Sequence, residues 1–300
     1  MARLAIFTER STIRSSVELT ALANFRLAAF EAGHQLDFLF RGELDYLERY
    51  DAVLIRAPTD PRNASYVVAR RAEIAGMRVL DQADSIRICC DKIAMYAHLT
   101  AAGVPIPETR FVDADDVHAA TARDLFERLG VPLVLKAPNS SFSAYVEKVA
   151  DEASFVRVAR RFLRRADRVV VQQYMPSEFD WRVVTLDGEV LAVVRYVFVP
   201  DRWKVMERGD HGEWARVEAV PRGAADPTLL KVALDAAGAI GRSLYGVDVK
   251  EVGGAYYVIE VNDNPTIAAG EEDQADPDLY ARIVAYLAGE DAAGGPTTTR

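Results

Sequence analysis

The sequence predicts an α/β protein in two parts: a small parallel α/β unit, and then a longer region that combines helices with antiparallel strands. Three observations support this fold class. A length of 300 residues suits about two domains. Residues 3–80 alternate between short apolar strands and helices, which is the pattern of a parallel sheet. After residue 169, successive strands are separated by turns, which indicates antiparallel pairing.

The first part is expected to hold four strands and two helices. Its helices end near Gly33 and Gly76, and glycine commonly follows the last turn of a helix. No Gly-x-Gly-x-x-Gly motif follows a strand, so the dinucleotide-binding fingerprint is missing. The predicted strands are 3–7, 35–40, 52–56 and 77–80, and the predicted helices are 16–33 and 62–75.

The second part is expected to begin with a helix over 91–102. Pro105 and Pro107 then keep the chain extended. The elements predicted after them are helix 115–129, strand 132–137, a strand from Tyr145, helix 152–166, strands 169–174, 180–185, 190–199 and 215–220, helix 226–244, a hairpin of 246–251 with 255–261, and helix 276–288. Residues 291–300 are expected to form a disordered tail.

Composition and charge narrow the class of protein. Hydrophobic residues make up 50% of the chain and charged residues 27%, so most of the chain is expected to be folded. The net charge of −9 disfavours general nucleic-acid binding. No apolar run approaches the ~18 residues of a membrane span, and the first residues lack the apolar stretch of a signal peptide. We therefore expect a cytoplasmic protein that does not bind membranes.

The positions of the cysteines and histidines in the sequence disfavour a zinc site. The two cysteines, Cys89 and Cys90, are adjacent, and the four histidines are far apart in the sequence. Neither arrangement has the paired spacing of a zinc site, and adjacent cysteines form a disulfide only with strain. The acidic surplus in the last third of the chain is compatible with a solvated surface or with a site for hard cations.

The strongest functional feature is the last predicted hairpin. Residues two apart on a strand share a face, so Glu260 and Asn262 point together while Val261 faces the core. The turn between the strands brings Asp248 opposite that face. Two carboxylates and an amide oxygen suit Mg²⁺, which proteins bind through one or two carboxylates plus substrate phosphates. An ordinary polar strand face is the alternative.

Two further segments are candidates for nucleotide binding. Lys136 ends an apolar strand, and the loop after it contains Ser141 among several hydroxyl groups that could hold phosphate oxygens. A lysine that only extends to solvent is the alternative. Gln173 and Tyr174 end a valine-rich strand, where backbone groups could contact an adenine edge.

Several basic residues follow on the next strands. Asp180 and Arg182 are two residues apart on one strand and therefore share a face. Arg195 ends the following strand, and Lys204 lies further along the chain. Each of these basic residues could equally lie on the surface. Only convergence on one cleft would make them phosphate-binding residues.

These motifs, in this order, resemble those of the ATP-grasp superfamily. The sequence is most similar to RimK-type carboxylate–amine ligases, which are relatives of glutathione synthetase, and above all to the long RimK-family proteins. The shared segments are Glu-Phe-Asp-Trp-Arg at 178–182, Leu-Tyr-Gly-Val-Asp at 244–248 and Glu-Val-Asn-Asp-Asn-Pro at 260–265. The resemblance covers about residues 50–287. It implies a small N-terminal parallel α/β domain followed by a two-lobed ATP-grasp domain of α+β character.

The resemblance also implies roles for the candidate residues. Asp248, Glu260 and Asn262 would hold two Mg²⁺ ions, or Mn²⁺ instead, with Glu260 bridging them. The implied nucleotide-binding residues are Lys92, Lys136, Ser141, Gln173, Tyr174, Asp180 and Lys204. Arg182 and Arg195 would be catalytic, facing the transferred phosphoryl group. Arg56, Thr59, Asn63 and Tyr66 would line the acceptor side.

The chain departs from its relatives at three places. Its phosphate loop has no glycine, residues 200–214 lack the Arg-Ser-Asn pattern of the glutamate-adding enzyme, and the N-terminal extension of the long relatives is missing. Lys204 would take the place of that pattern, and either Arg195 or the residue next to it would face the site. These three departures bear mostly on which substrates the implied enzyme would use.

The implied domains are residues 1–88, the domain before ATP-grasp, and 89–290, the ATP-grasp domain. A lid lobe would span about 105–172, and a metal and nucleotide lobe about 173–290. The implied enzyme is an ADP-forming acid–amino-acid ligase that joins a carboxylate to an amine, adding for example glutamate to a small molecule or a peptide. An ATP-binding regulator without turnover and a small-molecule kinase are the alternatives, and a homo-oligomer stays open.

A basic stripe is predicted outside these motifs. Six arginines recur at spacings of three and four on the predicted helix 152–166 and just after it: Arg157, Arg160, Arg161, Arg164, Arg165 and Arg168. Such a stripe is either a solvated face or a docking site for an acidic acceptor, such as a peptide tail.

Overall fold

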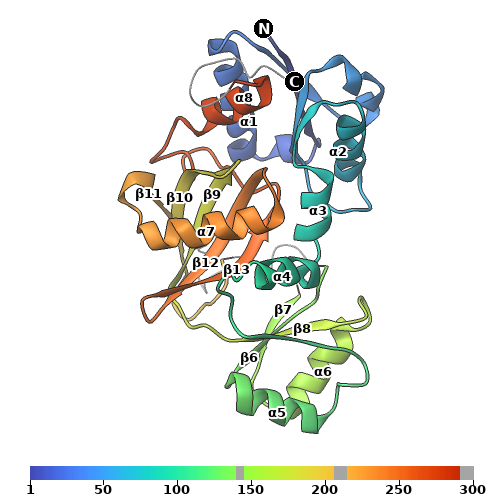
Figure 1. The fold of residues 1–300 in the computed structure, drawn as a ribbon, viewed down its shortest axis with the longest axis vertical. Helices are drawn as coiled ribbons and strands as arrows, with labels where there is room; N and C mark the ends of the chain where they lie inside the picture. Colours follow the sequence, from blue (N-terminus) through green and yellow to red (C-terminus); the bar gives the residue numbers. More distant parts are fainter. Residues whose placement is uncertain (140–144, 206–214, 291–300) are drawn as a thin grey trace.

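The computed structural model of the protein describes residues 1–139, 145–205 and 215–290. Three sheets follow one another along the long axis of the molecule (Figure 1). An N-terminal parallel sheet lies at one end, a five-stranded central sheet follows, and a four-stranded sheet with its own helices forms the other end. The fold is the mixed α/β arrangement that the sequence predicts.

The N-terminal sheet is formed by β1 (Arg3–Thr8), β2 (Gln35–Leu39), β3 (Ala52–Arg56) and β4 (Arg78–Leu80). All neighbouring strands are parallel, in the order β2-β1-β3-β4. Alternation along β1 sends Leu4 and Ile6 to one face and Ala5 and Phe7 to the other. Both faces are covered by helices, as a parallel sheet requires.

Helices α1 (Ser16–Glu31) and α8 (Leu279–Ala288) pack together over one face of this sheet, and α2 (Ala64–Ile74) packs over the other. Gly33 and Gly76 follow α1 and α2 with φ of 77° and 72°, a conformation that glycine adopts without strain. Helix α3 (Ala83–Cys89) leads out of this region. Short 3-10 helices lie at Thr12–Arg14, Arg41–Arg49 and Arg222–Ala224.

The far end of the molecule, which we call the lid, is an antiparallel sheet in the order β5-β8-β6-β7. Its strands are β5 (Thr109–Val112), β6 (Leu133–Lys136), β7 (Val146–Val149) and β8 (Val169–Gln173). Helices α5 (Ala119–Leu129) and α6 (Glu152–Phe162) cover one side of it and enclose a separate apolar core. Helix α4 (Lys92–Ala101) lies between the lid and the central sheet (Figure 1).

The central sheet is antiparallel throughout, in the order β11-β10-β9-β12-β13. Its strands are β9 (Phe179–Leu186), β10 (Glu189–Val197), β11 (Arg216–Val220), β12 (Leu244–Val252) and β13 (Ala255–Asn262). Helix α7 (Pro227–Ile240) begins with proline in its first turn and packs with α4 against one side of this sheet.

One apolar core joins the N-terminal sheet to the central sheet. It contains Leu4 and Phe25 from the N-terminal part together with Val184, Leu191 and Leu244 from the central strands. All five side chains are almost completely buried. The division at residues 88 and 89 predicted from the sequence therefore does not separate two independent cores.

Several element boundaries differ from the predicted ones. Helix α3 and strand β5 were not predicted, because each is short and has little periodicity of its own. Helix α6 ends at Phe162 rather than continuing to 166, because the chain enters a turn in which the Arg165 N–H donates to the Phe162 carbonyl. Helix α8 begins at Leu279. The predicted tail, 291–300, lies outside the described residues.

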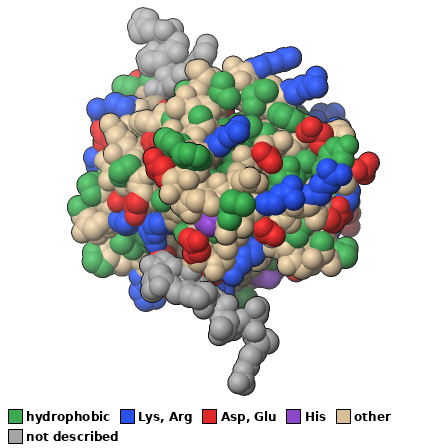
Figure 2. Space-filling view, turned by 90° about the horizontal axis from the view of Figure 1, so that it is seen from above, with side chains coloured by type: hydrophobic (Ala, Val, Ile, Leu, Met, Phe, Trp, Pro, Cys, Tyr) green, Lys and Arg blue, Asp and Glu red, His purple; other side chains and the backbone are tan. Residues whose placement is uncertain are grey.

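The surface does not concentrate one sign of charge in the view of Figure 2, where acidic and basic side chains are interspersed. Among the described residues, no helix combines the length and the apolar character that a membrane span needs.

Candidate active site

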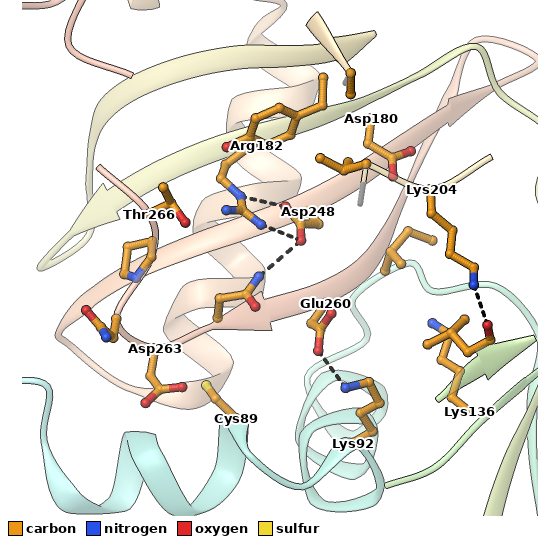
Figure 3. A pocket seen from close by; sticks show the side chains of 18 of the residues that line it. Cys89, Lys92, Lys136, Asp180, Arg182, Lys204, Asp248, Glu260, Asp263 and Thr266 are labelled. Atoms are coloured by element: carbon orange, nitrogen blue, oxygen red, sulfur yellow. Dashed lines mark hydrogen bonds and ion pairs between the residues drawn. The ribbon is translucent and has the colours of Figure 1, made fainter. Parts of the chain in front are cut away.

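A cavity of about 700 Å³ opens between the lid, the central sheet and the loops that follow the N-terminal strands. Strands β6 and β8 line one side of it, and β9, β12 and β13 line another. Figure 3 shows side chains from these elements pointing toward one another. The cavity has the size of a small-molecule site.

Register on the central sheet brings the key carboxylates together. Asp248 on β12 lies directly opposite Glu260 on β13 and opposite Arg182 on β9. Residues directly opposite in an antiparallel pair share a face, so all three side chains point into the cavity. Asn262 lies two residues beyond Glu260 and contacts Asp248 through its Nδ2, 3.1 Å from Asp248 Oδ2.

Asp248 is held by a bidentate ion pair. Arg182 Nε lies 2.7 Å from Asp248 Oδ1, and Arg182 Nη2 lies 2.8 Å from Asp248 Oδ2. Both side chains are mostly buried, with 15% and 17% exposed. Two parallel bonds between a guanidinium and a carboxylate fix both groups in orientation as well as in distance.

Glu260 is paired with the first residue of helix α4. Lys92 Nζ lies 2.7 Å from Glu260 Oε1. Burial on its own raises the pKa of Glu260, but Lys92, Lys136 and Arg182 together outweigh burial and lower it. Glu260 is therefore ionised near neutral pH. Helix α4 is placed for this contact because Asp91 caps its N-terminus, accepting from the N–H groups of Ile93 and Ala94.

Lys136 has no carboxylate partner among the described residues. It ends β6, is only 5% exposed, and its Nζ donates to the Tyr96 hydroxyl at 2.8 Å. Burial lowers the pKa of Lys136 to about 8. A buried ammonium that faces a cavity in this way is suited to an anionic ligand.

Asp180 lies on the same face of β9 as Arg182. Lys250 Nζ lies 2.5 Å from Asp180 Oδ1 and 2.7 Å from the hydroxyl oxygen of Ser177. Burial raises the pKa of Asp180, and Lys250 counteracts part of this effect. Lys250 was not singled out in the sequence, although its spacing of two from Asp248 puts it on the same strand face.

The end of the cavity near the lid is aromatic. Gln173, the last residue of β8, lines it together with Tyr174 and Met175, which follow the strand. The Tyr174 and Trp203 rings meet edge to face with centroids 5.9 Å apart, and Lys148 Nζ lies over both rings at 4.6 and 4.8 Å. An apolar slot with backbone groups at its edge is suited to a planar base.

Lys204 crosses from the segment after β10 to the lid, where its Nζ donates to the Val146 carbonyl at 2.6 Å. It therefore lines the cavity near the aromatic end (Figure 3). The bond to β7 connects the central part of the chain to the lid.

The end of the cavity near the N-terminal sheet is lined by loop residues of both parts. Arg56, at the end of β3, is buried, and its Nη1 donates to Asn264 Oδ1 at 2.8 Å and to the Pro265 carbonyl at 2.7 Å. Glu18 lies 3.9 Å from Arg56 Nη2. The Arg56 bonds to Asn264 and Pro265 fix the loop that directly follows Asn262, the last residue of β13.

Asp263 is a second acid in this loop. Only 6% of it is exposed, and burial raises its pKa to about 7. Asp81 is buried close by, and burial with the Asp263 charge raises its pKa well above the ordinary value. Asp81 Oδ2 accepts from the Asn264 N–H at 2.7 Å, so this acid also holds the loop in place.

The donor set fits a magnesium ion that is shared with a nucleotide. Asn262 Nδ2 donates to Asp248 and to the Gly246 carbonyl, so the amide oxygen is left as the ligand atom. Within the described ranges, no three His, Cys, Asp or Glu side chains are grouped closely enough to hold a metal on their own. Two carboxylates and one amide oxygen match the usual binding of Mg²⁺ with the help of phosphate oxygens.

The structure brings most of the predicted site residues to this one cavity. Those that line it are Lys92, Lys136, Gln173, Tyr174, Asp180, Arg182, Lys204, Asp248, Glu260 and Asn262. Ser141 lies outside the described residues. Of the acceptor-side candidates, Arg56 and Thr59 line the cavity, whereas Asn63 caps helix α2 and Tyr66 does not reach the cavity.

Arg195 is not brought to the cavity. Its neighbour on β10, Tyr196, lines the cavity instead, because alternation turns Arg195 to the opposite face. There Arg195 Nη2 lies 2.6 Å from Glu218 Oε2, and the guanidinium lies over the rings of Phe179 and Trp181. The prediction that Arg195 faces the site is thus corrected: Tyr196, the next residue, takes that side of β10.

The predicted basic stripe is not one helical face. Helix α6 ends at Phe162, so Arg164 and Arg165 lie in the following turn and Arg168 lies directly before β8. Arg161 pairs with Glu147 on β7, and the Arg165 guanidinium lies 4.3 Å from the centroid of the Tyr145 ring. These two side chains attach the helix and its turn to the edge of the lid sheet.

Comparison with known proteins shows similar chains. A probable alpha-L-glutamate ligase of Stutzerimonas stutzeri is 25% identical over 287 residues, which cover 94% of this chain and 89% of the relative. The glutamate–LysW ligase ArgX of Sulfolobus acidocaldarius is 29% identical over 226 residues, covering 73% and 75%. The structure of D-alanine–D-alanine ligase from Bacillus anthracis complexed with ATP has the same fold, with a TM-score of 0.69, 17% identity and 96% of each chain covered.

The fold and these relatives define the class of protein as an ATP-grasp ligase. The model of the RimK-like ATP-grasp domain matches residues 89–287. The chain belongs to the RimK-like ATP-grasp family, which confirms the resemblance drawn from the sequence motifs.

Proposed function

We propose that the protein is an ATP- and Mg²⁺-dependent carboxylate–amine ligase that forms an amide bond through an acyl phosphate. The observation that carries this proposal is the convergence on one cavity of two carboxylates and an amide with three cationic side chains. These are Asp248, Glu260 and Asn262 together with Lys92, Lys136 and Arg182. Phosphoryl transfer depends mainly on such positioning and charge stabilisation.

The nucleotide is proposed to span the cavity. Gln173 and Tyr174 lie at the aromatic end and would hold the base, while Asp180 would contact the ribose. Lys92 and Lys136 lie toward the other end and would bind phosphate oxygens. The charge of Lys136 is available for this because, among the described residues, its Nζ contacts the hydroxyl group and the ring of Tyr96 and pairs with no carboxylate.

In the first step, an oxygen of the substrate carboxylate attacks the γ-phosphorus of ATP. The bond from that phosphorus to the bridging oxygen breaks, ADP leaves, and the carboxylate becomes an acyl phosphate. Arg182 would stabilise the charge on the transferred phosphoryl group, since its guanidinium carries donors that match phosphate geometry. Asp248, Glu260 and Asn262 would hold Mg²⁺, which when bound neutralises phosphate charge.

In the second step, the amine nitrogen attacks the acyl carbon, and the bond from that carbon to the phosphate oxygen breaks. Phosphate leaves and the nitrogen loses a proton, so an amide remains. An acyl phosphate must be kept from water, and the lid is placed to cover the cavity through Lys204 and the Val146 carbonyl.

The substrates are proposed to enter near the N-terminal sheet. Arg56, Thr59 and Glu18 line this end of the cavity and can contact the charged groups of an amino acid. The relatives named as glutamate ligases support glutamate as the amino acid that is added. The relative that acts on LysW supports a peptide or a small protein as the second substrate, and a small-molecule amine is the other arm of the test.

Incubation with ATP, Mg²⁺ and a panel of amino acids and peptides, followed by mass spectrometry, tests the proposal. The expected result is an amide product with one ADP and one phosphate released per product. When the carboxylate is labelled with ¹⁸O, one labelled oxygen should appear in the phosphate. A phosphorylated product would instead show a kinase, and nucleotide binding without any product would favour a regulator. Glu260→Gln is the matched inactive control.

A further inference from the structure

Lys250 is a buried cation in the cavity to which the motifs assign no role. It is 8% exposed, it lies on β12, and its ammonium lies 4.9 Å from the centroid of the Phe198 ring. Its Nζ bonds to two groups at once, Ser177 Oγ at 2.7 Å and Asp180 Oδ1 at 2.5 Å. A buried lysine needs such partners, because an uncompensated ammonium would be costly to bury.

The Lys250 contacts lie between the two ends of the proposed nucleotide site. Ser177 follows closely after Tyr174 and Met175, which line the aromatic end. Asp180 lies two residues from Arg182 on the same strand face, at the phosphate end. A group held between a base slot and a phosphate site lies where the sugar of a nucleotide has to pass.

Asp180 has one oxygen engaged and one available. Oδ1 accepts from Lys250 and lies 3.5 Å from Ser177 Oγ. Within the described ranges, no group donates to Oδ2, and Asp180 lines the cavity (Figure 3). A carboxylate fixed through one oxygen can present the other to a hydroxyl group without losing rotational freedom on binding.

We propose that Lys250 is a positioning residue that holds Asp180 to accept a hydroxyl hydrogen bond from the ribose, and so sets a preference for ribonucleotides over 2′-deoxyribonucleotides. The proposal rests on the proposed function, because it takes this cavity as the nucleotide site. The protein would bind ATP more tightly than 2′-deoxyATP, because the deoxynucleotide lacks the hydroxyl group that donates to the second Asp180 oxygen. A lost hydrogen bond to a charged group corresponds to roughly 10- to 100-fold in affinity.

The test measures binding of ATP and 2′-deoxyATP by calorimetry with Mg²⁺ and the full-length protein. Wild type is expected to prefer ATP at least about tenfold. In Lys250→Met both affinities fall, and the ratio of the two approaches one, because Asp180 is no longer held. Lys250→Arg keeps a cation and is expected to retain most of the preference. Lys231→Met removes an exposed lysine paired with Asp235 and serves as the matched control with an unchanged ratio.

A double-mutant cycle separates positioning from general structural damage. If Lys250 acts through Asp180, the ratio in Asp180→Ala should not change further when Lys250→Met is added. Lys250→Gln provides the same test if the methionine variant does not fold, which thermal unfolding would reveal.

Different outcomes overturn different statements. A wild-type protein that binds neither nucleotide overturns the proposed function together with this inference. A wild type that binds both nucleotides equally overturns the inference alone. So does a Lys250→Met variant that keeps the wild-type ratio, or one whose effect persists in the Asp180→Ala background.

Discussion

Single residues of the cavity serve folding as well as the proposed chemistry. Each of three carboxylates is bonded to a cationic side chain, and removal of one partner leaves the other charge uncompensated in a mostly buried place. The pairs are Asp248 with Arg182, Glu260 with Lys92, and Asp180 with Lys250. Variants at these positions therefore have to be compared for stability and for activity separately.

Asp248→Asn is expected to lower the free energy of unfolding by about 3 kcal/mol, because it leaves the buried Arg182 guanidinium without its carboxylate partner. Adding Arg182→Met should restore more than half of that loss, while neither variant turns over. Denaturant unfolding of the two single variants and the double variant measures this coupling. Asp235→Asn, which breaks an exposed pair with Lys231, should change stability little. Simple addition of the two single losses would contradict the prediction.

ATP affinity is expected to fall as the pH rises above about 8, because Lys136 then loses the proton that gives it charge. The stability of the fold should change with pH in the opposite direction. An unfolded lysine titrates near 10.4, so between about pH 8 and 10.4 the unfolded chain binds more protons and stability rises with pH. Calorimetric titration of ATP from pH 7 to 9.5 measures the affinity. Lys136→Arg should remove the dependence, and a flat wild-type profile would exclude this role.

At the scale of elements, the site depends on how closely strand β12 and the loop after β13 approach. A Cβ atom at Gly246 would lie 2.7 Å from Pro265 Cβ, which is closer than two carbon atoms can pack. The same loop carries Asn264, which bonds to Arg56 and to the Ala57 carbonyl. Glycine at 246 is therefore required by the contact between a strand and a loop.

Gly246→Ala is expected to displace that loop, to cost about 1–3 kcal/mol of stability, and to lower turnover at least tenfold. Thermal unfolding and steady-state rates are the measurements. Gly238→Ala is the matched control: the position is exposed in helix α7 with no neighbour near the added methyl group. It should gain roughly 0.5–1 kcal/mol and keep full activity. Equal rates for both variants would show that the contact does not matter.

Periodicity predicted most helices and strands, because long apolar stripes record which face is buried. Strand β5 escaped prediction because its place is set by pairing with β8, far along the chain. Alternation predicted that Asp248 and Glu260 share a face, and the structure places them directly opposite. The side of β10 that faces the cavity depends on register with β9, which no local pattern records, and so Arg195 was placed on the wrong side.

At the scale of the whole molecule, the N-terminal sheet and the central sheet share one core. Leu186 and Leu191 pack in the same cluster as Leu22, and Ile283 of α8 joins them. The lid has a core of its own. The part matched by the family model therefore shares an apolar core with the N-terminal sheet, although it holds most residues of the cavity.

A fragment of residues 89–290 is expected not to fold, because it would expose the apolar side chains that now pack against α1 and β1. Circular dichroism and size-exclusion chromatography of the fragment would test this. The matched control is the chain 1–290, which keeps the whole core and should fold with the melting temperature of the full-length protein. A monomeric, cooperatively unfolding fragment would contradict the prediction.

The ion pairs in the cavity have a kinetic consequence. The positive and negative charges of each ion pair nearly cancel at a distance. The electrostatic potential that the pairs produce outside the cavity is therefore weaker than that of unpaired lysines and arginines. Nucleotide capture should then proceed by ordinary diffusion, with an association rate constant that changes little with ionic strength. Selectivity for the ligand would arise after entry. The phosphates would then replace Asp248 and Glu260 as partners of Arg182 and Lys92, and the metal ion would take up the two carboxylates.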